Sequence, residues 1–144
     1  MPFKIVIGEP KTRKAYQVER DVPSLIGMKI GDTFDGGSVG LPGFTLAITG
    51  GSDKEGFPMR TEVPGPGRKK MLLSGQPGFR PWRKGMRKRK YVRGNTISDS
   101  IMQVNCRIVS GEGDVATMLG IQPKVKEEPK SQEKKEEAKP EEKK

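Results

Sequence analysis

The sequence predicts a mainly β fold, and this prediction depends on its turn residues and its short apolar runs. The chain of 144 residues contains 19 Gly and 12 Pro. These residues interrupt the chain so often that no stretch keeps a helical apolar period for three turns, whereas short apolar runs recur between the turns. Because only 31% of the residues are hydrophobic, we expect one small core, with turns taking much of the length.

Alternation of apolar and polar residues marks the individual strands. We predict strands over residues 3–7, 15–20, 43–49, 69–74 and 101–109. The first two are expected to form a hairpin across the turn at residues 8–14. Between residues 21 and 40, frequent glycines permit at most one short helical turn, near residues 23–28. The run DVATML, within residues 111–120, predicts about two turns of helix near the end of the domain.

The composition changes sharply after Pro123. Lys and Glu then dominate, Pro129 and Pro140 interrupt any helix, and aromatic residues are absent. Such a segment buries too little apolar surface to offset the entropy of ordering its backbone, which costs roughly 1–2 kcal/mol per residue. We therefore expect a folded domain over residues 1–122 and a disordered Lys/Glu-rich tail over residues 123–144.

The positive charge is concentrated in one segment. The net charge is +10, yet residues 1–59 carry 7 basic and 7 acidic residues, whereas residues 60–93 carry 12 basic residues and 1 acidic residue. Charge packed this densely repels itself unless a polyanion lies beside it, and nucleic acid is the commonest such partner. The sequence therefore predicts a nucleic-acid-binding segment in the middle of the chain.

Several classes of function find little support in the sequence. No run of about 18 apolar residues is present to span a bilayer, and the N-terminus lacks the features of a signal peptide, so we expect a soluble, cytoplasmic protein. Cys106 is the only cysteine, which excludes an intrachain disulfide and predicts a small buried side chain on a strand. The chain has no His, the usual general base and the commonest transition-metal ligand. We expect no enzymatic activity, metal or cofactor.

Two pairs of carboxylates remain candidates for catalysis, Asp32 with Asp35 and Asp53 with Glu55. Both pairs lie in Gly-rich turns. In such turns an Asp side chain ordinarily accepts hydrogen bonds from nearby backbone amides. The turn interpretation is therefore favoured over a catalytic one for both pairs.

The run TGGSDKEGFPMR, over residues 49–60, permits two interpretations. It is not a Walker motif, because Lys and then Ser or Thr do not follow its last Gly. It is either a tight turn after a central strand, in which Asp53 accepts backbone amides, or a turn whose amides approach an RNA phosphate. In the second case Lys54 and Arg60 add positive charge. The two interpretations are compatible, and the sequence leaves both open.

The strongest functional signal is FRPWRKGMRKRKYVRG, over residues 79–94. Basic side chains neutralise phosphates, and the interleaved aromatic side chains can stack on unpaired bases, which folded RNA offers and duplexes rarely do. Two alternatives for the whole run are a solvated basic loop and a polybasic membrane tether, and the lack of a lipidation motif counts against the tether. For Trp82 and Tyr91 individually, the alternative is a packing role. The candidate RNA-binding residues are Lys54, Arg60, Arg68, Lys69, Lys70, Arg80, Trp82, Arg83, Lys84, Arg87, Lys88, Arg89, Lys90, Tyr91 and Arg93.

Four blocks of the sequence resemble a known family. They are ITGGSDKEGFPMR (48–60), RKKMLLSG (68–75), FRPWRKGMRKRKYVRG (79–94) and IVSGEGDV (108–115). In this order and spacing they resemble the small-subunit ribosomal protein S-six of the e type, which archaea and eukaryotes share and bacteria lack. The resemblance covers residues 2–122. It implies a small β-barrel-like domain on ribosomal RNA, with basic loops, such as residues 79–94, that reach between RNA helices.

The resemblance also implies a structural role in the small (30S) ribosomal subunit, in its assembly and in translation. The expected partners are small-subunit ribosomal RNA and neighbouring small-subunit proteins, with one copy of the chain per cytoplasmic ribosome. Eukaryotic members continue into a long basic helix and a phosphorylated serine-rich tail. The tail of the present chain, by contrast, contains a single serine, Ser131. This short form of the family therefore looks archaeal. A free single-strand RNA-binding protein or RNA chaperone on an OB-like barrel is the alternative.

Overall fold

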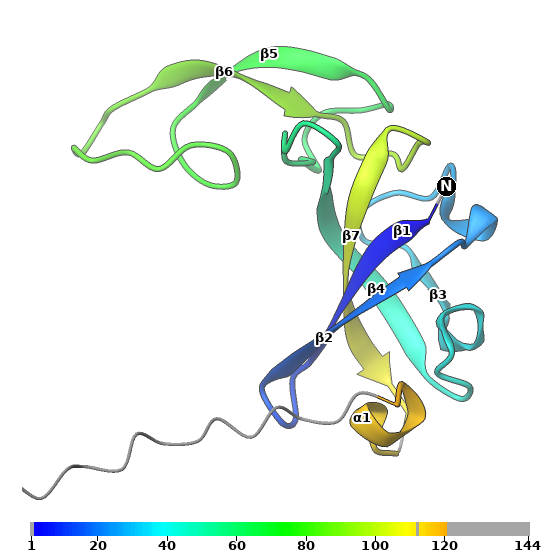
Figure 1. The fold of residues 1–144 in the computed structure, drawn as a ribbon. Coiled ribbons are helices and arrows are strands. Elements are labelled where there is room, and N and C mark those ends of the chain that lie inside the picture. The colour runs from blue at the N-terminus through cyan, green and yellow to red at the C-terminus, as the bar shows by residue number, and fades with distance from the viewer. Residues whose placement is uncertain (1, 112, 121–144) are drawn as a thin grey trace, which may run out of the picture.

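The computed structural model describes residues 2–111 and 113–120, which form two β-sheets with short helices (Figure 1). The strands are β1 (Phe3–Glu9), β2 (Lys14–Arg20), β3 (Thr33–Asp35), β4 (Thr45–Asp53), β5 (Arg68–Leu73), β6 (Lys88–Arg93) and β7 (Ile101–Ser110). The helices are the 3-10 helices η1 (Pro23–Leu25) and η2 (Gly36–Val39) and the α-helix α1 (Val115–Met118). The predicted mainly β fold with one short α-helix is confirmed, and all five predicted strands are present.

Five strands form an open sheet in the order β2-β1-β7-β4-β3. The hairpin predicted from the sequence pairs β1 with β2 in antiparallel register. The strand β7 lies between β1, to which it is parallel, and β4, to which it is antiparallel. Because β2 and β3 remain at the two edges, the described strands do not close into the barrel that the resemblance implied.

The main core lies against one face of this sheet. Ile5 of β1, Ile48 of β4 and Val104 of β7 are almost completely buried. They belong to the same cluster as Leu25 and Leu41 from the segment between β2 and β4. Burying an aliphatic side chain of this size contributes about 1.5–3 kcal/mol, so this cluster is the main source of stability for the sheet.

Cys106 packs on this core as the sequence predicted. Its side chain is buried on β7 and forms no disulfide. Burial raises the pKa of the Cys106 thiol to about 12, because a thiolate loses hydration inside the protein. The side chain therefore acts as a small apolar group at neutral pH.

The segment between β2 and β4 corrects one prediction. Instead of at most one helical turn, it contains η1, the short strand β3 and η2. The frequent glycines end these elements without preventing them. Gly40, for example, has a φ of 97° and caps η2 by donating its amide to the carbonyls of Gly36 and Gly37. A 3-10 helix of three or four residues needs few hydrogen bonds, so it can form where glycines are closely spaced.

The second correction concerns residues 79–94, which were expected to be a basic loop throughout. The last part of this run is the strand β6, which pairs antiparallel with β5 from Arg68 opposite Arg93 to Leu73 opposite Lys88. The alternation was hidden because five of the six residues in β6 are aromatic or basic. Long Lys and Arg side chains can cover a sheet with their aliphatic stems while their charged groups stay in water.

The β5–β6 ribbon and its connecting loop, residues 68–93, form a projection that we call the basic arm. Figure 1 shows the arm extending from the end of the large sheet at which β4 ends and β7 begins. A separate small core supports it, formed by Val63, Leu73, Phe79 and Val92. The arm is therefore packed separately from the main core.

Residues 123–144, the predicted disordered tail, lie outside the described residues. The tail and the domain boundary before it therefore stay predictions. Among the residues described, no helix has the length and apolar character needed to cross a membrane.

Candidate nucleic-acid interface

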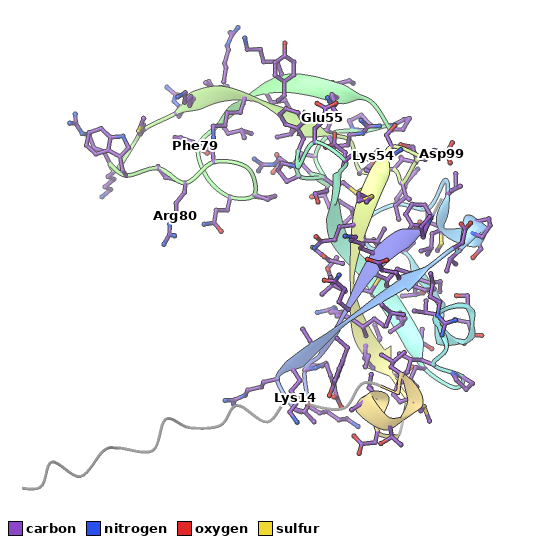
Figure 2. All side chains as sticks on the ribbon, viewed as in Figure 1. Lys14, Lys54, Glu55, Phe79, Arg80 and Asp99 are labelled. Atoms are coloured by element: carbon purple, nitrogen blue, oxygen red, sulfur yellow. The ribbon has the colours of Figure 1, made fainter. Side chains whose placement is uncertain are left out.

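The basic arm gathers most of the predicted RNA-binding residues on one projection. It carries eleven basic residues and no acidic residue. Its cations from Lys69 to Lys90 are all exposed to solvent. Figure 2 shows Arg80 in the connecting loop, directed away from the ribbon, whereas Lys14 lies at the far end of the molecule. The arm therefore has the densest concentration of basic residues in the described chain, and a field of this kind attracts polyanions.

The register of β5 and β6 gives the ribbon two different faces. Residues directly opposite each other in an antiparallel pair share a face. Lys69 lies opposite Val92, and Leu73 lies opposite Lys88, on the face that covers the small core. Lys70 opposite Tyr91 and Leu72 opposite Arg89 form the other face. This second face is open, since 54% of Leu72 and 52% of Tyr91 are exposed.

A buried carboxylate joins the base of the arm to the large sheet. Asp53, the last residue of β4, has a fully buried side chain. Its Oδ1 accepts hydrogen bonds from the amides of Glu55 and Phe57, both at 3.0 Å. Its Oδ2 accepts hydrogen bonds from Arg68 Nε of β5 at 2.7 Å and from Arg93 of β6 at 3.5 Å. A residue of the sheet thereby binds both strands of the arm.

These contacts keep the Asp53 carboxylate ionised. Burial alone would raise the pKa of Asp53, but hydrogen bonds from the Phe57 amide, Arg68 and the Glu55 amide outweigh it and lower the pKa below its ordinary value. The pKa of Glu55 is also lowered, mainly because Arg68 donates a hydrogen bond to it at 2.6 Å. Arg68 therefore lies between two carboxylates, and its own pKa is raised, mainly by Glu55.

Two further arginines attach the arm to its surroundings. Arg93 has only 11% of its side chain exposed, and it donates a hydrogen bond to the Ser98 hydroxyl at 3.2 Å. Arg60 forms an ion pair with Glu62 at 3.2 Å and donates a hydrogen bond to the Pro77 carbonyl at 3.4 Å. The backbone adds to this attachment, because the amide of Arg60 donates to the carbonyl of Arg93 at 3.0 Å.

Comparison with known proteins matches this chain to one family. The model of ribosomal protein S6e matches residues 3–120, which include both sheets, the basic arm and the helix. The chain belongs to the ribosomal protein S6e family. Small ribosomal subunit protein eS6 of Methanocaldococcus jannaschii is 48% identical over 120 residues, covering 83% of this chain and 92% of the relative. The eS6 of Methanobrevibacter smithii is 49% identical over 129 residues, covering 89% and 100%.

A longer relative shares the same region. The eS6 of Hyperthermus butylicus is 58% identical over 105 residues, which are 71% of this chain and 48% of that protein. The present chain therefore aligns with about half of this relative. The resemblance drawn from the four sequence blocks is confirmed, and all four lie within the residues that the S6e model matches. The archaeal origin of these relatives agrees with the archaeal appearance of the short form.

In this S6e-family chain, the structure divides the predicted RNA-binding residues into two groups. Arg60, Arg68 and Arg93 form ion pairs with carboxylates at the base of the arm. Lys54 lies beside this base (Figure 2), where its amide donates to the Ser100 carbonyl. The second group is exposed on the arm and consists of Lys69, Lys70, Arg80, Trp82, Arg83, Lys84, Arg87, Lys88, Arg89, Lys90 and Tyr91.

The two aromatic residues of the exposed group differ in their surroundings. Trp82 in the connecting loop is 74% exposed, and the Arg83 guanidinium lies over its ring at 4.5 Å from the centroid. Tyr91 is half exposed and meets the ring of Phe57 edge to face at 6.3 Å. Within the described chain, packing against other residues therefore covers part of the Tyr91 side chain but little of the Trp82 side chain.

Three of the four carboxylates considered for catalysis, those of Asp32, Asp53 and Glu55, are engaged in turns or ion pairs. Asp32 accepts the Lys29 amide at 2.7 Å, and Asp53 accepts the two amides that shape the turn after β4. The tight turn with Asp53 as acceptor of backbone amides is thus confirmed for the residues after Asp53, whereas residues 49–53 continue β4. The approach of this turn to RNA stays a prediction. In residues 2–111 and 113–120, no cluster of three or more acidic or Cys side chains is arranged to hold a metal ion.

Sequence reasoning missed the role of Phe57. This residue lies in the turn after β4, outside the basic run, and it contacts both Tyr91 and Arg68. It also missed that Asp53 binds two arginines of the arm. The available signal was an Asp close to an aromatic residue in a Gly-rich turn, shortly before the basic run.

Proposed function

We propose that this chain is a structural constituent of the small (30S) ribosomal subunit, in which the basic arm binds ribosomal RNA. The observation that carries the proposal is the exposure of the basic arm, a projection that holds eleven basic residues and no acidic residue. Relatives named small ribosomal subunit protein eS6 support the assignment. The chain acts in the cytoplasmic ribosome as one copy, with neighbouring small-subunit proteins around it, and its role is structural rather than enzymatic.

The exposed cations of the arm neutralise RNA phosphates, and the ion-paired arginines at its base hold the arm in place. Such phosphate contacts position a protein on RNA without reading base sequence. Specificity then comes from the shape of the folded RNA, between whose helices a narrow ribbon fits. Trp82 and Tyr91 add stacking surfaces for bases that are not paired.

Salt dependence tests the electrostatic part of the proposal. If the arm contacts about 6–10 phosphates, the affinity of the full chain for small-subunit RNA falls roughly 10³- to 10⁵-fold between about 50 and 200 mM salt. The affinity is measured by filter binding or fluorescence anisotropy across a salt series. An affinity that does not change with salt contradicts phosphate binding by the arm.

Co-sedimentation tests the ribosomal assignment against a free RNA-binding protein or chaperone. A structural constituent is retained in small subunits, at one copy per particle, through a wash at moderate salt. A chaperone washes off and is recovered away from the particle. Loss of the chain from the small subunits under this wash overturns the proposal, even where the purified chain binds RNA.

A further inference from the structure

We propose that a hollow beside Tyr91 binds one unpaired nucleotide of RNA, with its base against the Tyr91 ring and its phosphate beside Lys70 and Arg89. The inference rests on the proposed RNA-binding function and names the RNA feature that this part of the arm recognises. It distinguishes this site from the open surface of the arm, because here the base and the phosphate of one nucleotide are bound together.

The hollow lies between the arm and the turn that follows β4. Phe57 and Pro58 line it from the turn, Gly78 from the connecting loop, and Lys70, Arg89 and Tyr91 from the ribbon. Its volume is about 510 Å³, within the range of pockets that hold small ligands. Residues from three separate segments thus converge on a space large enough for a single nucleotide.

Tyr91 supplies a flat surface inside this hollow. Its ring meets the Phe57 ring edge to face, with 71° between the two planes, and half of its surface remains exposed. Phe57 therefore contacts Tyr91 without covering it. An exposed aromatic ring beside cations provides the stacking surface that unpaired bases use, since every base has a flat π face.

A chain of contacts from the buried junction holds this surface in place. Asp53 binds Arg68 through a hydrogen bond of 2.7 Å. The Arg68 guanidinium lies over the Phe57 ring at 4.7 Å from its centroid, and Phe57 in turn abuts Tyr91. The Phe57 backbone is also fixed, because its amide donates to Asp53 and its carbonyl accepts the Asp53 amide. A prearranged site loses less conformational entropy when its ligand binds.

The charges around the hollow favour an anion with an aromatic group. Lys70 Nζ lies 5.7 Å from the centroid of the Tyr91 ring, and Arg89 and Lys90 are neighbours of Tyr91 on β6. No acidic residue lines the hollow. A nucleotide offers both groups, a phosphate for the cations and a base for the ring. Bases within a duplex are already stacked and paired, so only an unpaired nucleotide can enter.

The test compares two RNAs with the full chain: a continuous duplex, and the same duplex with one bulged 2-aminopurine. Wild type is expected to bind the bulged RNA more tightly and to quench its fluorescence as the base stacks. Tyr91→Ala lowers the affinity for the bulged RNA roughly 5- to 150-fold, so that the preference over the continuous duplex is lost, and it abolishes the quenching. Tyr91→Phe keeps the flat ring and behaves as wild type.

Leu72→Ala is the matched control, because Leu72 is exposed on the same face of the ribbon but does not line the hollow. The inference is overturned if Tyr91→Ala binds the bulged RNA as tightly as wild type, or if Leu72→Ala causes the same loss. Should circular dichroism show that Tyr91→Ala has lost the fold, Tyr91→Leu carries the same test with a bulky side chain that cannot stack.

The two proposals fail in different ways. If the inference alone is wrong, wild type still binds RNA with steep salt dependence, but Tyr91→Ala binds the bulged RNA as tightly as wild type does. If RNA binding by the arm is wrong, wild type binds neither RNA at low salt.

Discussion

Among the residues that the structure describes, the main cluster against the five-stranded sheet contains seventeen buried side chains, whereas the cluster that supports the basic arm contains four. The charges are distributed in the opposite way. Residues 1–59, which include most of the sheet, balance 7 basic with 7 acidic residues, while the arm carries only cations. The difference separates the main source of stability, which is the core of the sheet, from the proposed RNA contact, which belongs to the arm.

The arm depends on the sheet for its position. A two-stranded ribbon is only marginally stable by itself in water, and mutual repulsion among its cations weakens it further. Asp53 and the backbone pairing of Arg60 with Arg93 attach it to the end of the sheet. The arm thus keeps a fixed direction although little apolar surface holds it.

The largest expected effect comes from removing charge from the arm. Changing Arg83, Lys84, Arg87 and Lys88 together to Gln reduces the slope of log affinity against log salt by about 4, roughly 1 for each phosphate that the arm no longer neutralises. Near 0.1 M salt this corresponds to a roughly 10³-fold weaker affinity for RNA. A salt series of RNA titrations measures both quantities.

Four cations of the β1–β2 hairpin provide the matched control. Lys11, Arg13, Lys14 and Arg20 are exposed on this hairpin and lie outside the arm, and Figure 2 shows Lys14 at the far end of the molecule from it. Changing these four residues to Gln removes the same net charge. If this variant loses as much affinity and slope as the arm variant, binding depends on total charge, and the division between sheet and arm is wrong.

Asp53→Asn tests the attachment between the two regions. Asn keeps an oxygen for the amides of Glu55 and Phe57 but removes the charge that faces Arg68 and Arg93. Removing one partner of a buried ion pair costs about 3–5 kcal/mol, and we expect a loss near the lower end, about 3 kcal/mol, because the turn is retained. Denaturant unfolding at neutral pH measures this loss.

The lowered pKa of Asp53 also predicts how the free energy of unfolding depends on pH. The folded-state pKa of Asp53 lies below its ordinary value of 3.8, so the ionised form stabilises the fold. Its contribution is fully present above the unfolded pKa and disappears as the pH falls through the folded pKa. Wild type therefore loses more unfolding free energy between neutral and acid pH than Asp53→Asn does. Identical pH profiles of the two proteins contradict the assigned role.

Shortening one apolar side chain in each region compares the two cores. Leu46 in the sheet and Leu73 in the arm are both fully buried. Leu73→Ala is expected to cost about 2 kcal/mol, at the low end for Leu-to-Ala changes, because the small cluster can collapse around it. Hydrogen exchange should then accelerate in β5 and β6 and remain slow in β7. Leu46→Ala, by contrast, should accelerate exchange in all strands of the sheet.

The sequence predicted the strands in which apolar residues alternate regularly with polar residues. Ile5 and Ile7 in β1 and Val104 and Cys106 in β7 face the core as the period of two requires. It did not predict β6, because only Val92 in that strand is aliphatic. Whether a run such as Lys88–Arg93 pairs with another strand depends on contacts with distant residues, which local periodicity does not contain.

The density of basic residues in the sequence was enough to locate the candidate interface. It was not enough to separate the ion-paired arginines at the base of the arm from the exposed cations. Nothing in the composition distinguishes Arg93, which is buried against Asp53, from Arg89, which is exposed. That distinction arises from strand register, since Arg93 falls at the base of the arm and Arg89 farther out. The hollow beside Tyr91 was missed for the same reason, because Phe57 reaches it only after β4 and β6 are brought together.

The smallest expected effect comes from deleting residues 124–144. This segment carries 8 basic and 7 acidic residues, a net charge of +1, so its removal changes the attraction to phosphates very little. We expect the affinity for RNA to stay within about twofold of the full chain, in contrast to the loss caused by the four substitutions in the arm. Parallel RNA titrations of the two chains measure the difference. A tenfold loss on deletion would mean that the Lys residues of this segment bind RNA in spite of their Glu neighbours, and that RNA contact is not confined to the arm.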